Sequence, residues 1–392
     1  MALTINNFWG AESGGMEEAA AFSNVIATSF DVKTGTYTYS IFSSAANVDF
    51  LPFESVADAG GKYIVKFDIR LESIGSNNHV TGFLQLTEGA APFLELALHD
   101  TTDDLLIYDA NGATIRTITQ PFTADVYSEL ILVFEHSASG TVELFIDGVS
   151  QGEDIAQDLT DGGTFDTLTF RKTINQALFK VDNIVFQSGA TNADDKLIGA
   201  EIFAYRSTVA SVTADWIKGA NGDLNSGTWV NAQEDPFSEA NIALYSDATA
   251  RAGGIDTNDD GGSAGTGGPN TDANIDGDSN IVAMKGIWRM KRGTGSGATH
   301  FGLLGNTGTA IADSDRTIDL TPLNSYVNYF DVREDNLPLS SEYGRIGFEK
   351  NSGGQDFDCS DMLFQVLHIP NVGGNVSLLS KFRRNMQHMM VR

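Results

Sequence analysis

The chain has 392 residues and a formal net charge of −28 at pH 7, from 52 acidic and 24 basic side chains. A surface this acidic repels phosphate backbones and anionic lipid headgroups, so we expect neither nucleic-acid nor membrane binding. The 41 glycines and 24 phenylalanines favour short strands and tight turns over helices, and the length allows two or three domains.

The amino-terminal residues, MALTINNFWGAESGG, contain no basic stretch and no apolar run, so we expect no secretory signal. The longest apolar runs, such as Leu130–Phe134, are far shorter than the roughly 20 residues needed to cross a bilayer. Cys359 is the only cysteine, so stability must come from the core, from partners or from bound ions. These features predict synthesis in a cytoplasm, with release by lysis if the protein works outside the cell.

Residues 1–190 are predicted to form one all-β domain. Apolar and polar residues alternate through Tyr63–Leu71, which is the period of a half-buried strand. Further short apolar segments follow, with turn residues between them: Phe83–Leu86, Phe93–Leu98, Leu105–Tyr108, Leu168–Phe170 and Leu178–Phe186. Strands at this density, without helical periodicity, predict a sandwich of two sheets.

An antiparallel hairpin is predicted at the centre of this domain. Glu129–His136 is apolar on both faces, and Thr141–Val149 alternates apolar and polar residues across a four-residue turn that ends in Gly140. A strand that is apolar on both faces belongs in the middle of a sheet that is covered on both sides. Asp147-Gly148 then predicts a further tight turn, because glycine adopts positive φ without penalty.

The second half repeats the β pattern over residues 197–370. A polar stretch of mostly small residues precedes it, and we place a linker at residues 191–196. The two halves close on similar segments, VDNIVFQS at Val181–Ser188 and CSDMLFQV at Cys359–Val366. This likeness suggests two related sandwiches in tandem.

The second half also contains a low-complexity loop, residues 253–279, made almost entirely of Gly, Asp, Asn, Thr and Ser. Such a segment cannot bury apolar area, so it is either a solvated loop or one organised by an ion. Oxygen-bearing side chains alternate as in a calcium-binding loop at Asp272, Asn274, Asp276 and Asp278, and Asp256, Asn258 and Asp260 repeat the spacing. The bidentate Glu of such loops is missing, so a solvated loop is favoured and calcium is the alternative.

Residues 371–392 form a basic, methionine-rich tail with four basic residues and no acidic ones. Large apolar residues recur at helical spacing, with cationic residues mostly on the other side: Leu378, Leu379, Phe382, Met386, Met389 and Met390, and Lys381, Arg383 and Arg384. We predict a short helical or extended tail that docks on another subunit or on a particle surface. A frayed end is the alternative.

Three segments of the first half carry a family resemblance: GAESGGMEEAAAFSNVIATSFDVKTGTYTYSI, ELILVFEHSASGTVELFIDGV and FKVDNIVFQS. Over most of residues 5–188 they resemble concanavalin A-like lectin/glucanase (laminin-G-type) sandwiches. The later runs DLTPLNSYVNYFDVREDN and YGRIGFEK are similar in style to β-sandwich structural proteins of tailed bacteriophages. The resemblance implies an all-β fold of two tandem jelly-roll sandwiches, of the kind that decorates phage heads, tails and fibres.

Glycoside hydrolysis is the obvious enzymatic use of this fold, and it needs two carboxyl groups about 5–9.5 Å apart. The glucanases of the family carry Glu-x-Asp-x-x-Glu on one strand, and that pattern is missing. Asp356, Asp358 and Asp361 have the spacing, but a polar strand edge explains them better. The six histidines lack zinc-site spacing, and no nucleophile elbow or phosphate-binding loop occurs. We therefore expect no enzymatic activity.

The resemblance and the composition together predict a non-enzymatic virion structural protein of a tailed phage. It would be a head decoration, a tail part or a fibre part, and its partners would be copies of itself or other virion proteins. A glycan-binding lectin module, calcium-dependent or not, is the alternative, and a divergent glycosidase is a remote third. The tryptophans could stack on sugars if exposed, although core packing is favoured for each: Trp9, Trp216, Trp229 and Trp288.

Overall fold

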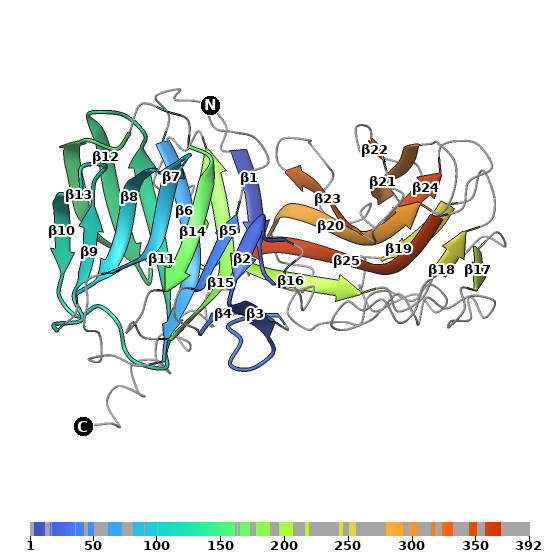
Figure 1. The fold of residues 1–392 in the computed structure, drawn as a ribbon, viewed down its shortest axis with the longest axis horizontal. Helices are drawn as coiled ribbons and strands as arrows, with labels where there is room; N and C mark the ends of the chain where they lie inside the picture. The colour runs from blue at the N-terminus through green and yellow to red at the C-terminus, as the bar shows by residue number, and fades with distance from the viewer. Residues whose placement is uncertain are drawn as a thin grey trace.

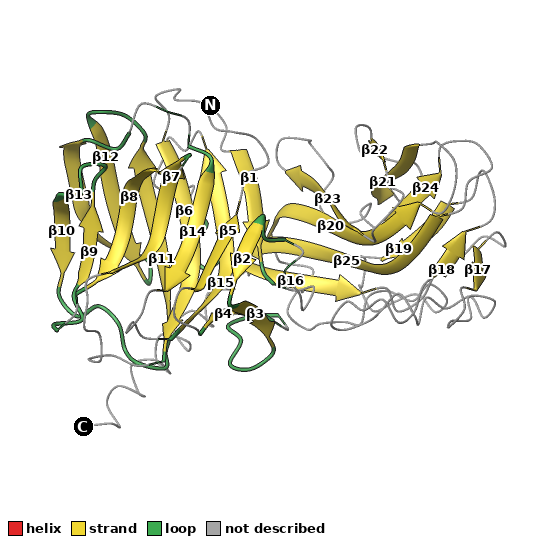
Figure 2. Cartoon of the chain, in the orientation of Figure 1, coloured by secondary structure: helices red, strands yellow, loops and turns green. Residues whose placement is uncertain are grey.

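The structure is a computed structural model, and every regular element in its described part is a β-strand (Figure 2). It describes residues 4–11, 16, 18–35, 37–42, 46–50, 62–72, 81–89, 91–99, 101–160, 163, 165–172, 178–188, 196–206, 216–218, 243–245, 251–255, 280–292, 298–304, 315–317, 324–331, 345–350 and 357–369. The predicted all-β fold is therefore confirmed. The tail at residues 371–392 lies outside the described residues.

An eight-stranded antiparallel sheet forms one layer of the first half, in the order β13-β12-β11-β6-β15-β4-β3, with β1 also paired to β15 (Figure 1). Its strands are β1 (Thr4–Trp9), β3 (Val25–Thr28), β4 (Thr38–Ile41), β6 (Lys62–Leu71), β11 (Tyr127–Glu135), β12 (Gly140–Ile146), β13 (Val149–Gln157) and β15 (Phe179–Ser188). The predicted hairpin is β11 and β12, and the turn after it uses Asp147 and Gly148 at φ values of 50° and 77°.

A seven-stranded antiparallel sheet forms the second layer, in the order β10-β9-β8-β7-β14-β5-β2. Its strands are β2 (Ala21–Ser23), β5 (Ala46–Phe50), β7 (Thr81–Glu88), β8 (Ala91–Leu98), β9 (Leu105–Tyr108), β10 (Thr114–Ile118) and β14 (Thr167–Lys172). Arg116 of β10 holds Asp154 of β13 through Nε at 2.6 Å and Nη2 at 2.8 Å, which closes the sandwich at that edge.

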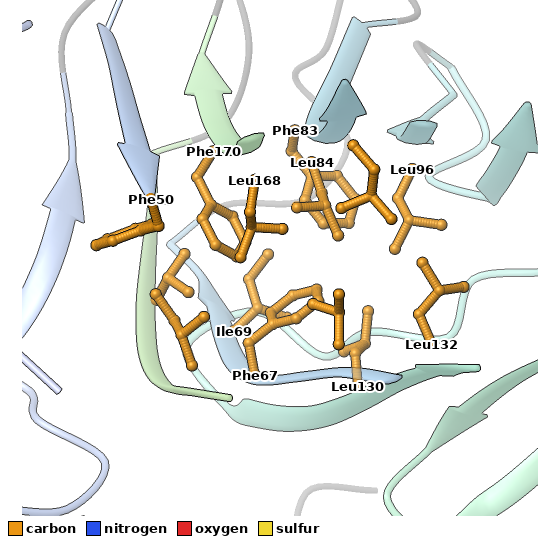
Figure 3. Close-up of a cluster of buried hydrophobic side chains, with 14 of the residues drawn as sticks. Phe50, Phe67, Ile69, Phe83, Leu84, Leu96, Leu130, Leu132, Leu168 and Phe170 are labelled. Carbon is orange, nitrogen blue, oxygen red and sulfur yellow. The ribbon is translucent and has the colours of Figure 1, made fainter. Parts of the chain in front are cut away.

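The two sheets pack face to face over one apolar core (Figure 3). Alternate residues of each strand point inward, so Phe67 of the first sheet meets Phe170 of the second with ring centroids 5.1 Å apart. Phe50 and Trp9 extend this aromatic contact, again with centroids 5.1 Å apart. Trp9 is 2% exposed, so the prediction that it packs in the core is confirmed.

The outer face of the eight-stranded sheet is also covered near β11. Ile131 and Val133 are buried there in a small cluster with Ile64 and Phe145. The ammonium of Lys196 lies 4.3 Å from the centroid of the Phe145 ring. The prediction of a central strand covered on both faces is thus confirmed for β11.

The remaining strands form a six-stranded sheet, in the order β17-β18-β25-β20-β23 with β16 paired to β25, and a four-stranded sheet, β19-β24-β21-β22. Their bounds are β16 (Glu201–Arg206), β17 (Trp216–Lys218), β18 (Ala243–Tyr245), β19 (Arg251–Ile255), β20 (Asn280–Arg292), β21 (Ala298–Leu304), β22 (Asp315–Thr317), β23 (Asn324–Asp331), β24 (Arg345–Lys350) and β25 (Phe357–Ile369). All pairings are antiparallel.

The six-stranded sheet packs against the first sandwich. Phe8 and Val185 of the sandwich share a buried apolar cluster with Ala283 of β20 and Leu367 of β25. Beside them Lys285 forms an ion pair with Glu18 and donates to the backbone carbonyl of Phe8. Gln365 Nε2 donates to the other oxygen of Glu18 at 2.8 Å. We call Glu18, Lys285 and Gln365 the junction lock.

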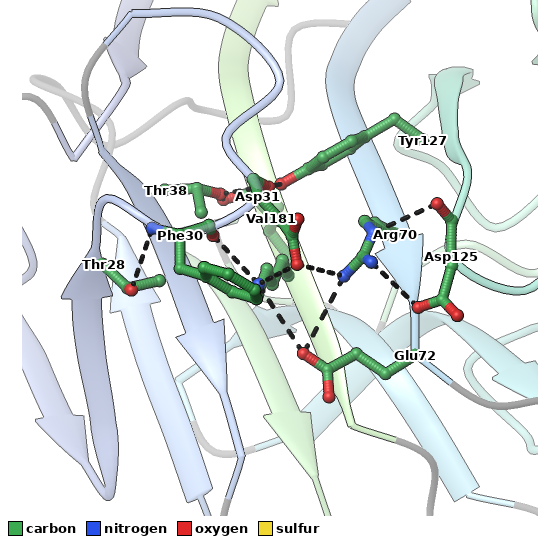
Figure 4. Close-up of polar contacts among 10 residues, drawn as sticks. Thr28, Phe30, Asp31, Thr38, Arg70, Glu72, Asp125, Tyr127 and Val181 are labelled. Carbon is green, nitrogen blue, oxygen red and sulfur yellow. Dashed lines mark hydrogen bonds and ion pairs between the residues drawn. The ribbon is translucent and has the colours of Figure 1, made fainter.

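A polar network fastens the segment at residues 28–35 to the eight-stranded sheet (Figure 4). Arg70 Nη2 contacts Asp125 Oδ1 at 2.9 Å, and its Nη1 contacts Asp31 Oδ2 at 3.3 Å. Lys180 Nζ donates to the backbone carbonyl of Phe30 at 2.9 Å, and the Tyr127 hydroxyl donates to that of Asp31 at 2.8 Å. The network holds this segment at one end of the neighbouring strands β15, β6 and β11.

Candidate functional site

A row of polar side chains crosses five strands on the outer face of the seven-stranded sheet. The strand register places Tyr108 opposite Glu95, Glu95 opposite Gln85, Gln85 opposite Thr169, and Thr169 opposite Asp49. Their strand neighbours point into the core, so these five point away from it. We call Tyr108, Glu95, Gln85, Thr169 and Asp49 the polar row.

The carboxylate of Glu95 is held in a fixed position within this row. Gln85 Nε2 donates to Glu95 Oε2 at 2.5 Å, and Arg171 Nη2 lies 3.5 Å from the same oxygen. The carboxylate lies over Gly82, where an added Cβ would come within 2.1 Å of Glu95 Oε1. Arg171 Nε also donates to the Gly82 carbonyl at 3.4 Å. Glycine at this position is therefore what allows Glu95 to lie across the sheet.

A pocket of about 460 Å³ opens beside Glu95 and Tyr108. It is lined by Ala91, Pro92, Glu95, Tyr108, Asp109, Ala110, Asn111 and Gly112. Its far wall is a tight turn, in which Asp109 Oδ1 accepts from the backbone N–H of Asn111 at 3.0 Å and of Ala113 at 2.8 Å. These hydrogen bonds hold the turn in place beside the pocket.

The pocket and the row have the groups that a saccharide ligand requires. The Tyr108 ring offers an apolar surface, and burial raises the pKa of its hydroxyl, so that group remains a neutral donor and acceptor. Glu95 and Asp109 offer carboxylate oxygens that accept hydrogen bonds from hydroxyl groups. Two acidic side chains at the pocket favour neutral or cationic ligands over acidic ones.

A second polar cluster lies buried on the outer face of the eight-stranded sheet. In the strand register Asp182 lies opposite Asp68, and Asp68 lies opposite Glu129. Three carboxyl groups therefore lie side by side on three adjacent strands. Lys66 lies beside them and is fully buried. Burial and the neighbouring Asp68 raise the pKa of Asp182 to about 8. Lys66, Asp68 and Asp182 are closed to solvent, and the Glu129 side chain is 12% exposed, so the centre of this cluster cannot receive a ligand.

A third buried pair, His136 and Glu88, lies at one end of the core. The His136 ring lies beside the Phe93 ring, tilted by 50° with centroids 4.5 Å apart, and contacts Glu88 Oε1 through Nε2. Glu88 also accepts from Thr160 Oγ1 at 2.8 Å and from the Gly163 backbone N–H at 2.5 Å. These bonds hold a loop to the core, so His136 has a structural place here.

None of the predicted site residues is tested by these clusters. The calcium candidates Asp272, Asn274, Asp276 and Asp278, and the docking tail from Leu378 to Met390, lie outside the described residues. Asp358 and Asp361 lie on β25, and Asp356 is not described. Within the described residues, no three His, Cys, Asp or Glu side chains could hold a metal ion, and no helix has the length and apolar character to cross a membrane.

The sequence alone does not identify the polar row. Glu95 is the only charged residue in the strand APFLELAL, and Gln85 has the same place in TGFLQLTE. An isolated charged or amide side chain in an apolar strand is a signal, because it marks the outward face at that position. The pairing of the two strands, which brings both residues together, cannot be read from either segment alone.

No family model matches the chain, and no curated protein matches it. Among solved structures it resembles an endo-β-1,4-glucuronan lyase from the fungus Trichoderma reesei, with 14% identity over 49% of this chain and 98% of that one and a TM-score of 0.37.

Two further solved structures resemble the chain with similar identities and TM-scores. A carbohydrate esterase of the Shiga toxin-encoding bacteriophage phi24B has 13% identity over 48% of this chain and 100% of that one, with a TM-score of 0.38. Domain 4 of AbnA, a GH43 extracellular arabinanase from Geobacillus stearothermophilus, has 12% identity over 49% and 96%, with a TM-score of 0.34. At these identities and TM-scores the likeness assigns no activity to this chain.

Proposed function

We propose that the chain is a non-enzymatic adhesion protein whose first sandwich binds a glycan on the outer face of the seven-stranded sheet. The observation that carries this proposal is the polar row with its pocket. An open face lined by carboxylate, amide and hydroxyl groups suits a chain of sugar units, because each unit can bond to a different strand. The pocket at the Tyr108 end would hold one terminal or branching unit.

The arrangement of carboxylates supports binding rather than hydrolysis. Glu95 and Asp49 are three strands apart in the row, and each carboxylate accepts a hydrogen bond from its own neighbour, Glu95 from Gln85 Nε2 and Asp49 from Thr169 Oγ1 at 2.8 Å. A glycosidase instead needs two carboxyl groups that flank one bond. Asp109, the nearer carboxylate, is engaged in holding its turn.

Replacing Tyr108 by Ala and Glu95 by Gln should each weaken glycan binding at least about tenfold, because each removes a contact in the pocket. The measurement is a glycan array with the wild-type protein, followed by calorimetric titration of the best glycan into each variant. Glu153→Gln is the matched control, since Glu153 is an exposed carboxylate on the other sheet.

Each arm of this experiment has a clear reading. Array binding that the two pocket variants lose and the control keeps supports the proposal. Binding that all the variants keep places the glycan elsewhere, and no binding on the array contradicts the adhesion function. Release of shorter sugars by the purified wild-type protein would contradict the non-enzymatic part. An arm with EDTA tests whether binding depends on calcium.

We also propose that this adhesion protein is a structural part of a tailed-phage virion, as head decoration, tail component or fibre component. The junction lock supports a structural role, because a buried ion pair between two folded parts fixes their relative orientation. A rigid two-part protein suits a particle surface, where a module must project at a set angle.

Deletion of residues 376–392 should leave a folded protein that no longer assembles, because this tail carries the predicted docking residues. The measurement compares incorporation of full-length and truncated protein into particles purified from a lysate, with circular dichroism as the check on folding. A variant with Lys381, Arg383 and Arg384 changed to Gln is the matched control for charge alone. Normal incorporation of the truncated protein would contradict the docking role.

A further inference from the structure

Lys66, Asp68 and Asn183 come together beneath the surface of the eight-stranded sheet. Lys66 and Asp68 lie on one face of β6, and Asn183 lies on the neighbouring strand β15. A β-bulge between Asp182 and Val185 adds one residue to β15 at this place, and Asn183 takes a φ of 49° there. Bulges change the direction of side chains, and this one turns Asn183 toward the face that carries Lys66 and Asp68.

One carboxylate oxygen joins the two other side chains. Asp68 Oδ2 accepts a hydrogen bond from Asn183 Nδ2 at 2.8 Å and lies 3.6 Å from Lys66 Nζ. The other contact of Lys66 Nζ is Glu129 Oε2 at 3.5 Å, so both exceed an ordinary hydrogen bond. Lys66 and Asn183 are fully buried, and Asp68 is 2% exposed. The amine and the amide therefore meet at one proton acceptor, with solvent excluded.

The carbonyl oxygen of the same amide is held by two donors. Asn183 Oδ1 accepts from the backbone N–H of Ile202 at 2.8 Å and from Thr34 Oγ1 at 2.9 Å. Two donors aimed at a carbonyl oxygen stabilise the negative charge that develops there when a nucleophile adds to the carbon. The amide thus has a donor pair on its oxygen and a proton carrier on its nitrogen.

We propose that Lys66 and Asn183 become joined by an intramolecular isopeptide bond, with Asp68 as the proton carrier. Lys66 passes one proton to Asp68, and the lone pair of the resulting Lys66 amine attacks Cγ of Asn183. The Cγ–Nδ2 bond then breaks while Asp68 returns the proton to Nδ2, and Lys66 loses a further proton as the new amide forms. Ammonia leaves and becomes ammonium in water. No oxidant or cofactor is consumed.

The protonation of Lys66 sets the rate of this step. Burial lowers the pKa of Lys66, but Asp68 and Glu129 outweigh this effect and raise it overall, so the neutral amine is the minor form. A reaction that occurs once in the life of each molecule can proceed slowly from a minor form. The product would be a covalent link between β6 and β15, two neighbouring strands in the middle of the sheet. The only cysteine of the chain is Cys359.

The test is the intact mass of the purified full-length protein, measured fresh and after prolonged incubation in the folded state. Loss of ammonia lowers the mass by about 17 Da, and tryptic digestion then yields one branched peptide that contains both Lys66 and Asn183. Lys66→Arg and Asp68→Asn should each keep the full mass. Lys180→Arg, which changes another buried lysine of this face, should show the same deficit as the wild type.

The possible outcomes distinguish the isopeptide bond from other reactions that lower the mass. A deficit of about 17 Da with the branched peptide supports the bond, and a deficit that persists in Lys66→Arg reflects imide formation elsewhere and overturns it. A deficit of about 18 Da means loss of water to a carboxyl side chain, which overturns the assignment to Asn183. The full mass in folded wild-type protein after prolonged incubation also overturns the proposal, whatever the variants do.

Discussion

Replacing Glu18 by Gln is expected to lower the free energy of unfolding by about 3–5 kcal/mol, because it leaves the buried ammonium of Lys285 without its counterion. Both side chains are 1% exposed, so water cannot take the place of the lost carboxylate. Burial lowers the pKa of Lys285 and Glu18 raises it, with burial the larger effect. Removing Glu18 takes away the opposing interaction, so Lys285 must either lose its proton or remain buried and unpaired.

Urea-induced unfolding measures this loss, with Lys62→Ala as the control. Lys62 pairs with Glu153 on an open surface, where both side chains are more than 40% exposed, and its loss should change the free energy of unfolding by no more than about 0.5 kcal/mol. The double variant Glu18→Leu with Lys285→Met should recover most of the stability, since it removes both charges together. A Glu18→Gln protein as stable as the wild type would show that the junction lock carries no buried charge.

The strands could be predicted from the sequence because each depends on local alternation. The segment Tyr63–Leu71 places Val65, Phe67 and Ile69 in the core in the structure, as its period requires. The hairpin of β11 and β12 has the same local cause, since its turn joins two segments adjacent in the chain. Two buried faces for β11 follow from its continuous apolar run.

The polar clusters depend on contacts that the sequence does not display. Lys66 and Asp68 alternate with core residues, which predicts solvent exposure, yet both are buried because other segments cover this face. Asn183 reaches them only because a bulge interrupts the strand, and a period of two cannot show a bulge. The position of Glu95 depends in the same way on Gly82, which lies on the neighbouring strand.

Asp182 is expected to make the protein less stable as pH rises from about 4 to about 8. Burial and the neighbouring Asp68 raise its pKa in the folded protein to about 8, from 3.8 in the unfolded chain, against three backbone N–H donors that lower it. Between these values the folded protein keeps a proton that the unfolded chain releases. The stabilisation is fully present below the unfolded pKa, falls by at most about 1.4 kcal/mol per pH unit, and is gone above the folded pKa.

Other charged groups face the same cluster and must be separated from Asp182. They are Asp68 and Lys66 of β6, Tyr127 and Glu129 of β11, Lys33 of the segment at residues 28–35, and Glu201 of β16. Burial also raises the pKa of Glu129 and Glu201, so these two groups contribute a slope of the same sign. The informative quantity is therefore the difference in free energy of unfolding between the wild type and Asp182→Asn at each pH.

That difference should favour the wild type progressively as pH falls from 8 to 4, by a total on the order of 3–5 kcal/mol. Urea-induced unfolding at five pH values measures it, and Asp125→Asn, an exposed position of the network around Arg70, is the control that should leave the slope unchanged. A difference that is constant with pH would show that Asp182 is ionised throughout. Asp182 would then be charged together with the carboxylates that pair with Lys66, and Lys66 would be paired too firmly to attack Asn183.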